Sequence, residues 1–424
     1  MANPQTIKNG ALHSVYPFLY GFDFDETDMD NRFASLLETH AALFSKTDAK
    51  LFSTAGRSEL GGNHTDHNLG KVIAATINLD TIAAVSPRND TKVVLISEGY
   101  PAVEVDLSNL GKVSSEENTT QALVRGIGAA FSKRGLSIGG WEANTTSRVL
   151  KGSGLSSSAA IEILCGTIFN HLYNEDVLTP VELAIIGKFS ENEYFGKPSG
   201  LMDQIACANG GIVGIDFRDG DNPVVVPVPF SFSQHGYALA IVDTGGNHAD
   251  LTPEYAAVPK EMRLVAAQFG KENLRQISKE EFEAKLPQLR ATLNNDRALL
   301  RAIHFYSENE RVSSMVTALQ KNDFPSYLAL VKASGESSFC FLQNLYPASN
   351  PKEQGLSLAI ALTRNILGEQ YVARVHGGGF AGTIQAYVPL NKIQSYTKSM
   401  ETVFGKGSVT AICIRQKPTC CIAE

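Results

Sequence analysis

The chain has 424 residues, of which 43% are hydrophobic and 19% are charged, and its formal net charge is −7. This composition excludes an intrinsically disordered chain, and the acidic balance without a lysine or arginine run argues against nucleic acid or an anionic membrane as the main partner. Because single hydrophobic cores stop growing at about 250–300 residues, we expect two domains.

The cysteines and the N-terminal segment bear on the compartment. Six cysteines occur without a CxxC motif, and a chain of this size needs no disulfides, so we expect reduced thiols. The first residues lack the charged and apolar regions of a secretion signal, and no run of about 18 apolar residues is present to span a bilayer. We therefore expect a cytoplasmic protein. The adjacent Cys420 and Cys421 could form a redox or metal feature, but the pattern favours a frayed, inert C-terminal tail.

The first half begins with a predicted helix at 27–45, followed by strands. After the Gly/Ser stretch at 152–158, apolar residues recur at helical spacing from Ile161 to Leu172, which predicts a core-facing helix. Thr179, Pro180 and Glu182 then form a capping-box pattern that starts a helix running to about Tyr194. Alternating or apolar runs predict strands at 71–77, 81–86, 92–97 and 143–150, with a strand and turn around 211–221.

The second half begins after a stretch at 222–236 that is rich in proline, serine and apolar residues. We place the domain boundary there, with an N-terminal domain at 1–222 and a C-terminal domain at 223–424. The order of elements is an α+β pattern and not a regular βαβ alternation. The elements expected are a strand at 237–243, a largely helical block at 253–340, a strand–loop–strand unit at 371–389, a helix near 390–404 and a strand at 408–414.

The stretch GSGLSSSAA at 152–160 has the features of a phosphate-binding helix start. Gly152 and Gly154 permit a positive φ and the close approach of a ligand, and the serines after them open a helix whose unpaired N–H groups and dipole attract anions. A serine-rich helix cap without a ligand would have the same sequence. The stretch lacks the lysine of a P-loop, and it is not the GxGxxG of a dinucleotide-binding fold.

Two further stretches are weak signals by themselves. In GKPSGLMDQ, Asp203 stands among apolar and small residues, which suits a carboxylate that accepts a proton or holds an arginine, although a capping aspartate in a turn gives the same pattern. HGGGFAG, at 376–382, places four glycines between two predicted strands. Such a loop either passes close to a ligand or makes a tight bend.

The densest group of polar residues lies in GRSELGGNHTDHN, at 56–68. It brings Arg57, Asn63, His64, Asp66 and His67 together among glycines. A surface loop gains nothing from this density. A pocket for a ligand with many hydroxyls needs several donors and acceptors, because each unpaired buried hydroxyl costs about 1–3 kcal/mol.

In their order along the chain, these stretches resemble the motifs of the GHMP kinase superfamily and, within it, of the galactokinase family. That family's signature is approximately GRVNLIGEHTDYN, where this chain has GRSELGGNHTDHN. Its G-x-GLSSSAA, GIMDQ and GGGFGG motifs are matched here by GSGLSSSAA, GLMDQ and GGGFAG. The resemblance spans residues 40–400, and the occurrence of all the motifs in order makes it specific.

The resemblance implies a two-domain α+β GHMP kinase fold. Its N-terminal domain would be similar to ribosomal protein S5 and its C-terminal domain would be ferredoxin-like, with the active site in the cleft between them. It also implies a sugar pocket lined on one side by residues of the first motif, with further residues across from them. The residues implied are Arg57, Asn63, His64 and Asp66 on the first side, and Gly200, Asp203 and Tyr255 on the other.

The reaction implied is transfer of the γ-phosphoryl group of ATP to the anomeric hydroxyl of a hexose. Asp203 would take or direct the hydroxyl proton, while Arg57 would keep Asp203 ionised and stabilise the developing alkoxide. Ser158 and Glu191 match the family's ligands for Mg²⁺. Backbone N–H groups would hold the phosphates, and the residues concerned are Gly152, Ser153, Gly154, Leu155, Ser156, Ser157 and Ser158.

Departures from the signature bear on the substrate more than on the class of reaction. Loss of a negative charge at Asn63 makes a uronic acid such as galacturonate, or another galactose-like sugar that is modified at C6, admissible beside galactose. Asn63 could also accept the same hydroxyl as the glutamate of the signature, which would leave an ordinary galactokinase-type substrate. Glu59 replaces an asparagine and Asn63 a glutamate, while Gly61, His67, His376 and Ala381 replace isoleucine, tyrosine, threonine and glycine.

Two other functions fit parts of the pattern. A sensor that binds galactose and ATP without catalysis is one, but the complete SSSAA stretch together with Arg57 and Asp203 favours catalysis. A kinase for a non-sugar alcohol such as mevalonate is the other, and the NHTDHN block disfavours it. The expected partners are a small-molecule sugar, ATP and Mg²⁺, and we expect a monomer or a weak homo-oligomer.

Overall fold

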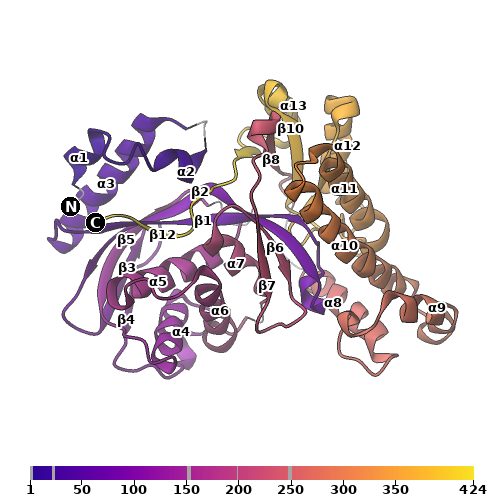
Figure 1. Ribbon diagram of the computed structural model, residues 1–424, viewed down its shortest axis with the longest axis horizontal. Coiled ribbons are helices and arrows are strands. Elements are labelled where there is room, and N and C mark those ends of the chain that lie inside the picture. Colours follow the sequence, from indigo (N-terminus) through magenta and orange to yellow (C-terminus); the bar gives the residue numbers. More distant parts are fainter. Residues whose placement is uncertain (1–2, 22–23, 150–153, 198, 247–250) are drawn as a thin grey trace.

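The structure is a computed structural model that describes residues 3–21, 24–149, 154–197, 199–246 and 251–424. Figure 1 shows an elongated molecule with the N-terminal half of the chain on the left and long helices of the second half on the right. This mixed arrangement of helices and sheets is the expected α+β class. No helix within the described ranges is both long and apolar enough to cross a bilayer.

The larger sheet has eight strands in the order β12-β1-β2-β5-β3-β4, with β6 beside β2 and β7 beside β6. Its longest strand, β2, has 17 residues and joins the two strands predicted at 71–77 and 81–86. The polar Asp80 between them does not end the strand, because Arg32 donates to its buried carboxylate at 2.6 Å. The strands are β1 Lys50–Gly61, β2 Lys71–Pro87, β3 Lys92–Ser97, β4 Val103–Asp106, β5 Trp141–Ser147, β6 Ile212–Asp216, β7 Val224–Val228 and β12 Cys420–Ala423.

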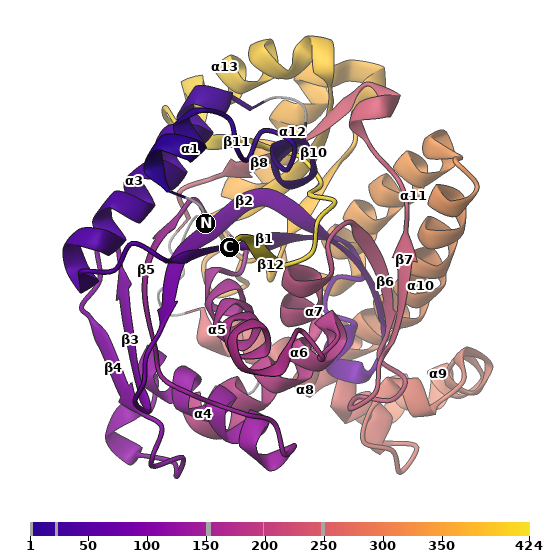
Figure 2. The same ribbon diagram turned by 60° about the vertical axis from the view of Figure 1, so that its left-hand side comes forward.

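Helices cover both faces of this sheet. Adjacent residues of a strand point to opposite faces, so Ile82 and Ala84 enter a core with α1–α3, whereas Ala83 and Val85 enter a core with α4, α5 and α6. Figure 2 shows α4 to α7 grouped together, away from α3. The helices are α1 Pro4–Lys8, α2 Tyr16–Tyr20, α3 Glu26–Phe44, α4 Thr120–Lys133, α5 Ser157–Asn174, α6 Pro180–Ser190 and α7 Met202–Asn209.

The predicted capping box starts α6. Thr179 accepts from the backbone of Glu182, and Glu182 accepts from the backbone of Thr179. A π-helical turn over Glu191–Phe195 follows α6, so the helical path ends within a residue of the predicted Tyr194. π-Turns of this kind are frequent at functional sites.

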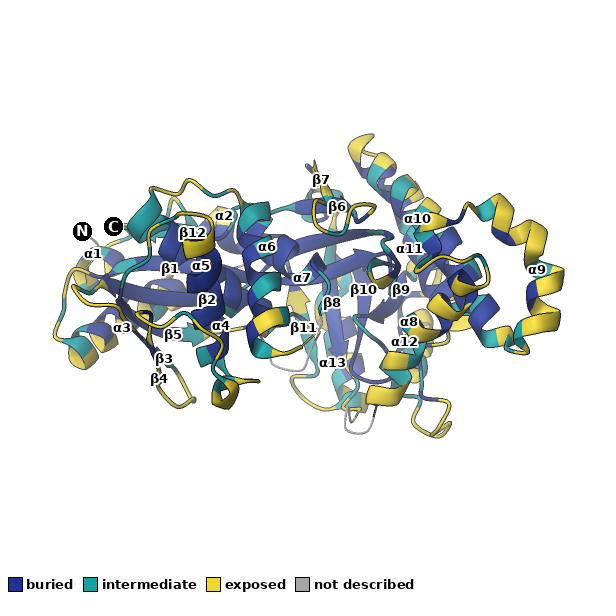
Figure 3. Cartoon of the chain, turned by 90° about the horizontal axis from the view of Figure 1, so that it is seen from below, coloured by how far each residue is buried: buried dark blue, intermediate teal, exposed yellow. Residues whose placement is uncertain are grey.

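The smaller sheet has four antiparallel strands in the order β11-β8-β10-β9. An apolar core joins the two sheets, since Ile73 of β2 and Tyr387 of β10 pack in one cluster with Met315 of α10. In Figure 3, the strands near this junction are buried, and α9 at the end of the molecule is largely exposed. The elements are β8 Tyr237–Asp243, α8 Thr252–Ala267, α9 Lys279–Leu293, α10 Asp296–Gln320, α11 Phe324–Ser337, α12 Gly355–Leu367, β9 Ala373–His376, β10 Thr383–Pro389, α13 Ile393–Phe404 and β11 Val409–Ile412.

The predicted boundary at 222/223 does not coincide with the division between the sheets. β7 pairs with β6, and β12 pairs with β1, so both strands extend the larger sheet although they follow residue 222. The division of the chain into two domains stays a prediction. The expectation of a frayed C-terminal tail is wrong, because Cys420 and Cys421 are paired in register with Ser53 and Phe52 of β1.

Candidate active site

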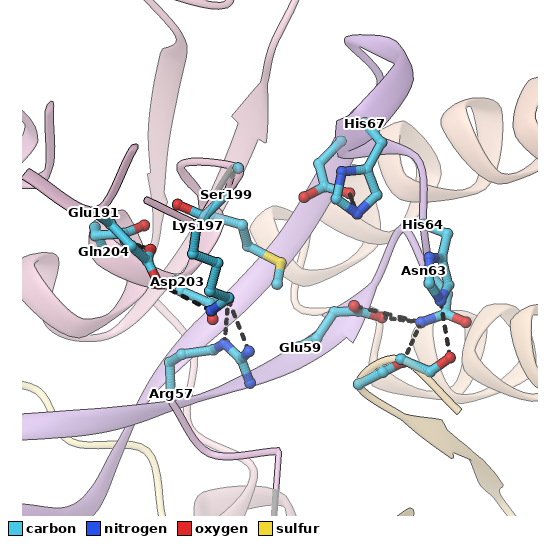
Figure 4. A pocket seen from close by; sticks show the side chains of 15 residues that line it. Arg57, Glu59, Asn63, His64, His67, Glu191, Lys197, Ser199, Asp203 and Gln204 are labelled. Carbon is cyan, nitrogen blue, oxygen red and sulfur yellow. Dashed lines mark hydrogen bonds and ion pairs between the residues drawn. The ribbon is translucent and has the colours of Figure 1, made fainter. Parts of the chain in front are cut away.

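A cavity of about 220 Å³ brings together residues from three of the stretches that the sequence singled out (Figure 4). They are the first motif, the segment that ends in GLMDQ, and the glycine loop. The wall also includes residues to which the sequence gave no role. The lining residues are Arg57, Glu59, Asn63, His64, Asp66, His67, Glu191, Lys197, Ser199, Gly200, Met202, Asp203, Gln204, Gly377 and Gly378.

Arg57 on β1 and Asp203 in the first turn of α7 form an ion pair on this wall. Arg57 Nε donates to Asp203 Oδ1 at 2.8 Å, and Nη2 lies 2.7 Å from the same oxygen. The pairing of β1 with β2 shifts register between Ala55 and Arg57, and such a bulge changes the direction in which a side chain points. The predicted catalytic pair therefore meets in space across 146 residues of sequence.

The charges of this pair are stabilised locally. Burial disfavours both charged forms, but their mutual attraction outweighs it, so the pKa of Asp203 lies below its usual value and the pKa of Arg57 lies above. Ser156 Oγ also donates to Asp203 Oδ2 at 2.5 Å, and Arg57 Nη1 donates to the carbonyl oxygen of Gly154. The start of the Gly/Ser helix is thus tied directly to the carboxylate.

The predicted phosphate-binding stretch lies only partly within the described residues. Gly152 and Ser153 fall outside them, Gly154 has a φ of +72°, and α5 begins at Ser157. Leu155 is buried, and its carbonyl oxygen accepts from the backbone N–H of Arg57 at 3.1 Å. Ser157 and the exposed Ser158 line a second cavity of about 530 Å³.

Asn63 and His64 both contact the glycine loop. Asn63 Nδ2 donates to the carbonyl oxygen of Gly377 at 2.7 Å, and His64 Nε2 lies 2.9 Å from that of Gly378. Burial, followed by the charge of His67, lowers the pKa of His64 to about 4, so the ring is neutral at neutral pH. A neutral ring with Nε2 facing a carbonyl carries its proton there, which leaves Nδ1 as the acceptor.

Asp66 and Gly200 face each other on the wall. A Cβ atom added to Gly200 would lie 2.7 Å from Asp66 Oδ2, so only glycine leaves the carboxylate where it is. Tyr255 is absent from the lining residues among the described part of the chain. Its hydroxyl instead donates to the carbonyl oxygen of Gly379 at 2.9 Å, which supports the glycine loop. Direct contact of Tyr255 with a sugar stays a prediction.

The predicted metal ligand Glu191 lies at the start of the π-turn and is buried. Its carboxylate accepts from Lys197 Nζ and from Gln204 Nε2, each at 2.9 Å. Gln204 Nε2 also donates to Glu162 at 2.9 Å. Burial, and then the charge of Glu191, raises the pKa of Glu162 to about 8, so Glu162 is largely protonated at neutral pH. Of these two carboxyl groups, Glu191 is the one that lines the cavity.

Glu59 and Lys197 line the cavity, although sequence reasoning gave neither a role. Arg374 Nη2 donates to Glu59 Oε1 at 2.6 Å, and Arg374 is wholly buried. Glu59 stands two residues after Arg57 on one strand, and this alternation could have placed it on the same face. Arg374 gave no such signal, because 315 residues separate it from Glu59.

Comparison with known proteins identifies the family. Residues 120–211 match the model of the GHMP kinase N-terminal domain, and residues 38–87 match that of the galactokinase galactose-binding signature. Galactokinase of Actinobacillus pleuropneumoniae is 32% identical over 345 residues, which cover 80% of this chain and 85% of the relative. Galactokinase of Streptomyces coelicolor is 30% identical over 377 residues, which cover 88% and 93%.

Solved structures have the same fold. Lactococcus lactis galactokinase complexed with galactose matches with a TM-score of 0.77 at 24% identity, over 92% of this chain and 100% of that one. A mevalonate kinase matches with a TM-score of 0.61 at 16% identity, over 87% and 99%. The fold is therefore the α+β fold of the GHMP kinases, and the chain belongs to the galactokinase family of that superfamily.

Proposed function

We propose that this chain transfers the γ-phosphoryl group of ATP to the anomeric hydroxyl of galactose, giving galactose 1-phosphate and ADP. Membership of the galactokinase family supports an ATP-dependent sugar kinase. The observation that carries the proposal is the Arg57–Asp203 ion pair, held by Ser156 on the wall of a polar cavity. An ionised acid beside a fixed guanidinium suits phosphoryl transfer, because the acid orients the acceptor hydroxyl and the guanidinium stabilises the charge that develops on it.

Asp203 orients the acceptor hydroxyl as a fixed negative charge. Both of its oxygens already accept hydrogen bonds, and its low pKa makes it a weak base. Phosphoryl transfer depends mainly on positioning and charge neutralisation. As the bond between the γ-phosphorus and the ADP oxygen breaks and the new P–O bond to the sugar forms, the hydroxyl proton leaves late, to a phosphate oxygen or to solvent. Arg57 lies where it can stabilise the negative charge that develops on the sugar oxygen.

The start of α5 holds the phosphates of ATP in this proposal. The first N–H groups of a helix have no intrahelical partners, and the helix dipole adds partial positive charge at that end. Ser157 and Ser158 lie there on the wall of the second cavity, which also includes Tyr100 and Phe195 and is large enough for the nucleoside.

The residues predicted to bind Mg²⁺ have suitable donor atoms. Mg²⁺ prefers oxygen ligands and keeps several waters, and Ser158 offers an exposed hydroxyl while Glu191 offers a carboxylate beside the cavity. Lys197 neutralises Glu191 in this structure, so a positive charge is already accommodated at that carboxylate. Bound Mg²⁺ would neutralise the phosphate oxygens during transfer.

Product analysis tests the proposal. The purified chain is incubated with ATP, Mg²⁺ and galactose, release of ADP is followed, and NMR locates the phosphate on the sugar. Phosphate on the anomeric carbon is the expected result. Phosphate on C6, or no turnover with any hexose or uronic acid, would overturn the proposal. Sugar and ATP binding without any turnover would identify a sensor.

A further inference from the structure

Glu59 and Asn63 exchange the two residue types that the family signature has at their positions, where an asparagine is followed four residues later by a glutamate. Both side chains lie on the cavity wall, and Asn63 Nδ2 donates to Glu59 Oε1 at 3.2 Å (Figure 4). A carboxylate is therefore still present on this wall. It is carried by strand β1 and not by the turn that follows the strand.

The Glu59 carboxylate is fixed by hydrogen bonds from protein side chains, and it can still accept a further hydrogen bond. Oε1 accepts from the buried Arg374 at 2.6 Å and from Asn63. Oε2 has one hydrogen bond among the described residues, a long one of 3.5 Å from Asn63 Nδ2. Because a carboxylate oxygen has two lone pairs, Oε2 can accept from a ligand hydroxyl. Figure 4 shows Glu59 on the side of the cavity where Asn63 lies, separate from Asp203.

Asn63, in contrast, uses its polar atoms within the protein. Nδ2 donates to Gly377 and to Glu59, and Oδ1 accepts from Asn344 Nδ2 at 2.8 Å. The residue is 1% exposed. A glutamate at this position would place a carboxylate against the Gly377 carbonyl oxygen and the Glu59 carboxylate, which are both acceptors. Asn63 thus suits a residue that positions the glycine loop.

We propose that Glu59 determines specificity by accepting a hydrogen bond from a hydroxyl of the hexose, and that Asn63 positions the glycine loop without contacting the sugar. The proposal rests on the proposed function only in that the ligand of this cavity is a hexose. It narrows the substrate class to neutral hexoses. The described wall carries four carboxylates, from Glu59, Asp66, Glu191 and Asp203. They outnumber the cations Arg57 and Lys197 on the wall and Arg374 next to Glu59, so a uronic acid is repelled.

Sugar binding without ATP, measured by calorimetry, is the primary test. Galactose, its four monodeoxy derivatives (2-, 3-, 4- and 6-deoxy) and galacturonate are each titrated into the wild type, Glu59→Gln and Asn63→Asp. Glu59→Gln should weaken galactose binding about tenfold, because a neutral acceptor replaces a charged one. One deoxygalactose, which lacks the hydroxyl that faces Glu59, should bind both proteins alike. Asn63→Asp should weaken the binding of galactose and of every deoxygalactose by the same factor.

Selectivity gives a second readout. The ratio of the affinities for galacturonate and galactose should rise about tenfold in Glu59→Gln. Glu261→Gln is the matched control, because Glu261 also pairs with a wholly buried arginine, Arg301, but lies outside the cavity wall. This control should lower the melting temperature and leave every affinity ratio unchanged. If Glu59→Gln does not fold with Arg374 left unpaired, Glu59→Gln/Arg374→Met removes both charges, and the same ratios are expected.

Three results would overturn the inference. They are unchanged galactose binding in a folded Glu59 variant, a loss that is equal for all deoxygalactoses, and a deoxygalactose that escapes the effect of Asn63→Asp. Absence of turnover in a wild type that binds galactose overturns the proposed function and leaves this inference standing. Turnover by the wild type with unaltered specificity in Glu59→Gln overturns this inference alone.

Discussion

Replacement of Asp203 by asparagine separates the charge of this residue from its hydrogen bonds. Asparagine has nearly the same shape, so its oxygen can still accept from Arg57, and Ser156 can turn its hydroxyl to accept from the new amide group. Alanine would instead leave the buried Arg57 without its partner. Loss of one member of a buried ion pair typically costs about 3–5 kcal/mol of unfolding free energy. An alanine variant could therefore lose activity because it unfolds, and this loss would not be distinguishable from a loss of catalysis.

The expected magnitudes differ for stability and activity. A hydrogen bond to a charged group is worth about 1.5–3 kcal/mol and a neutral one about 0.5–1.5 kcal/mol, so Asp203→Asn should lose roughly 1–3 kcal/mol in total and remain folded. Removal of one fixed group that positions or stabilises the reacting atoms costs about 10²–10³-fold in kcat, and we expect kcat to fall by this factor. Nucleotide affinity should change little if the phosphates bind at the start of α5 as proposed, because Asp203→Asn keeps a hydrogen bond with Ser156.

The assay combines initial rates of ADP release with thermal unfolding and calorimetric ATP binding. Asp216→Asn is the control, since Asp216 also pairs with an arginine, Arg275, at 2.9 Å but lies outside the cavity wall. It should lose stability and keep kcat. A folded Asp203→Asn with the kcat of the wild type would refute the role given to Asp203.

Three further predictions concern other parts of the site. Gly200→Ala should displace the Asp66 carboxylate and lower kcat/KM for galactose by up to about 100-fold with an unchanged ATP affinity, and an unchanged kcat/KM would contradict the placement of Asp66. The pKa of His64 is lowered to about 4 in the folded protein, so between pH 6.5 and about pH 4 the unfolded chain binds a proton that the folded chain does not bind. The free energy of unfolding should therefore decrease as the pH is lowered through this range. His64→Asn, in which asparagine tolerates the φ of +59°, should make the melting temperature less dependent on pH there. Ser158→Ala and Glu191→Gln should each raise the Mg²⁺ concentration that gives half-maximal activity, and a Mg²⁺ titration that coincides with the wild type would exclude the substituted residue as a ligand.

The sequence by itself determined the features that depend on short stretches of chain. The capping box at Thr179 predicted the start of α6, because the residues that satisfy the first N–H groups of a helix are adjacent to it. The spacing of apolar residues from Ile161 to Leu172 predicted the core-facing helix that the structure contains as α5. The order of the motifs along the chain indicated the family. That resemblance implied that Arg57 lies beside Asp203, and the structure contains the ion pair.

Tertiary structure alone decided the contacts between distant segments. The last strand of the chain, β12, pairs with β1, the first strand of the chain, and Arg374 donates a hydrogen bond to Glu59. The side chain of Asn63 makes hydrogen bonds with Gly377 and Asn344, whereas the sequence had suggested a hydrogen bond with a sugar hydroxyl. Periodicity and capping report only on neighbours within a few turns of chain, whereas a buried charge or amide takes its partner from whichever element the topology packs against it.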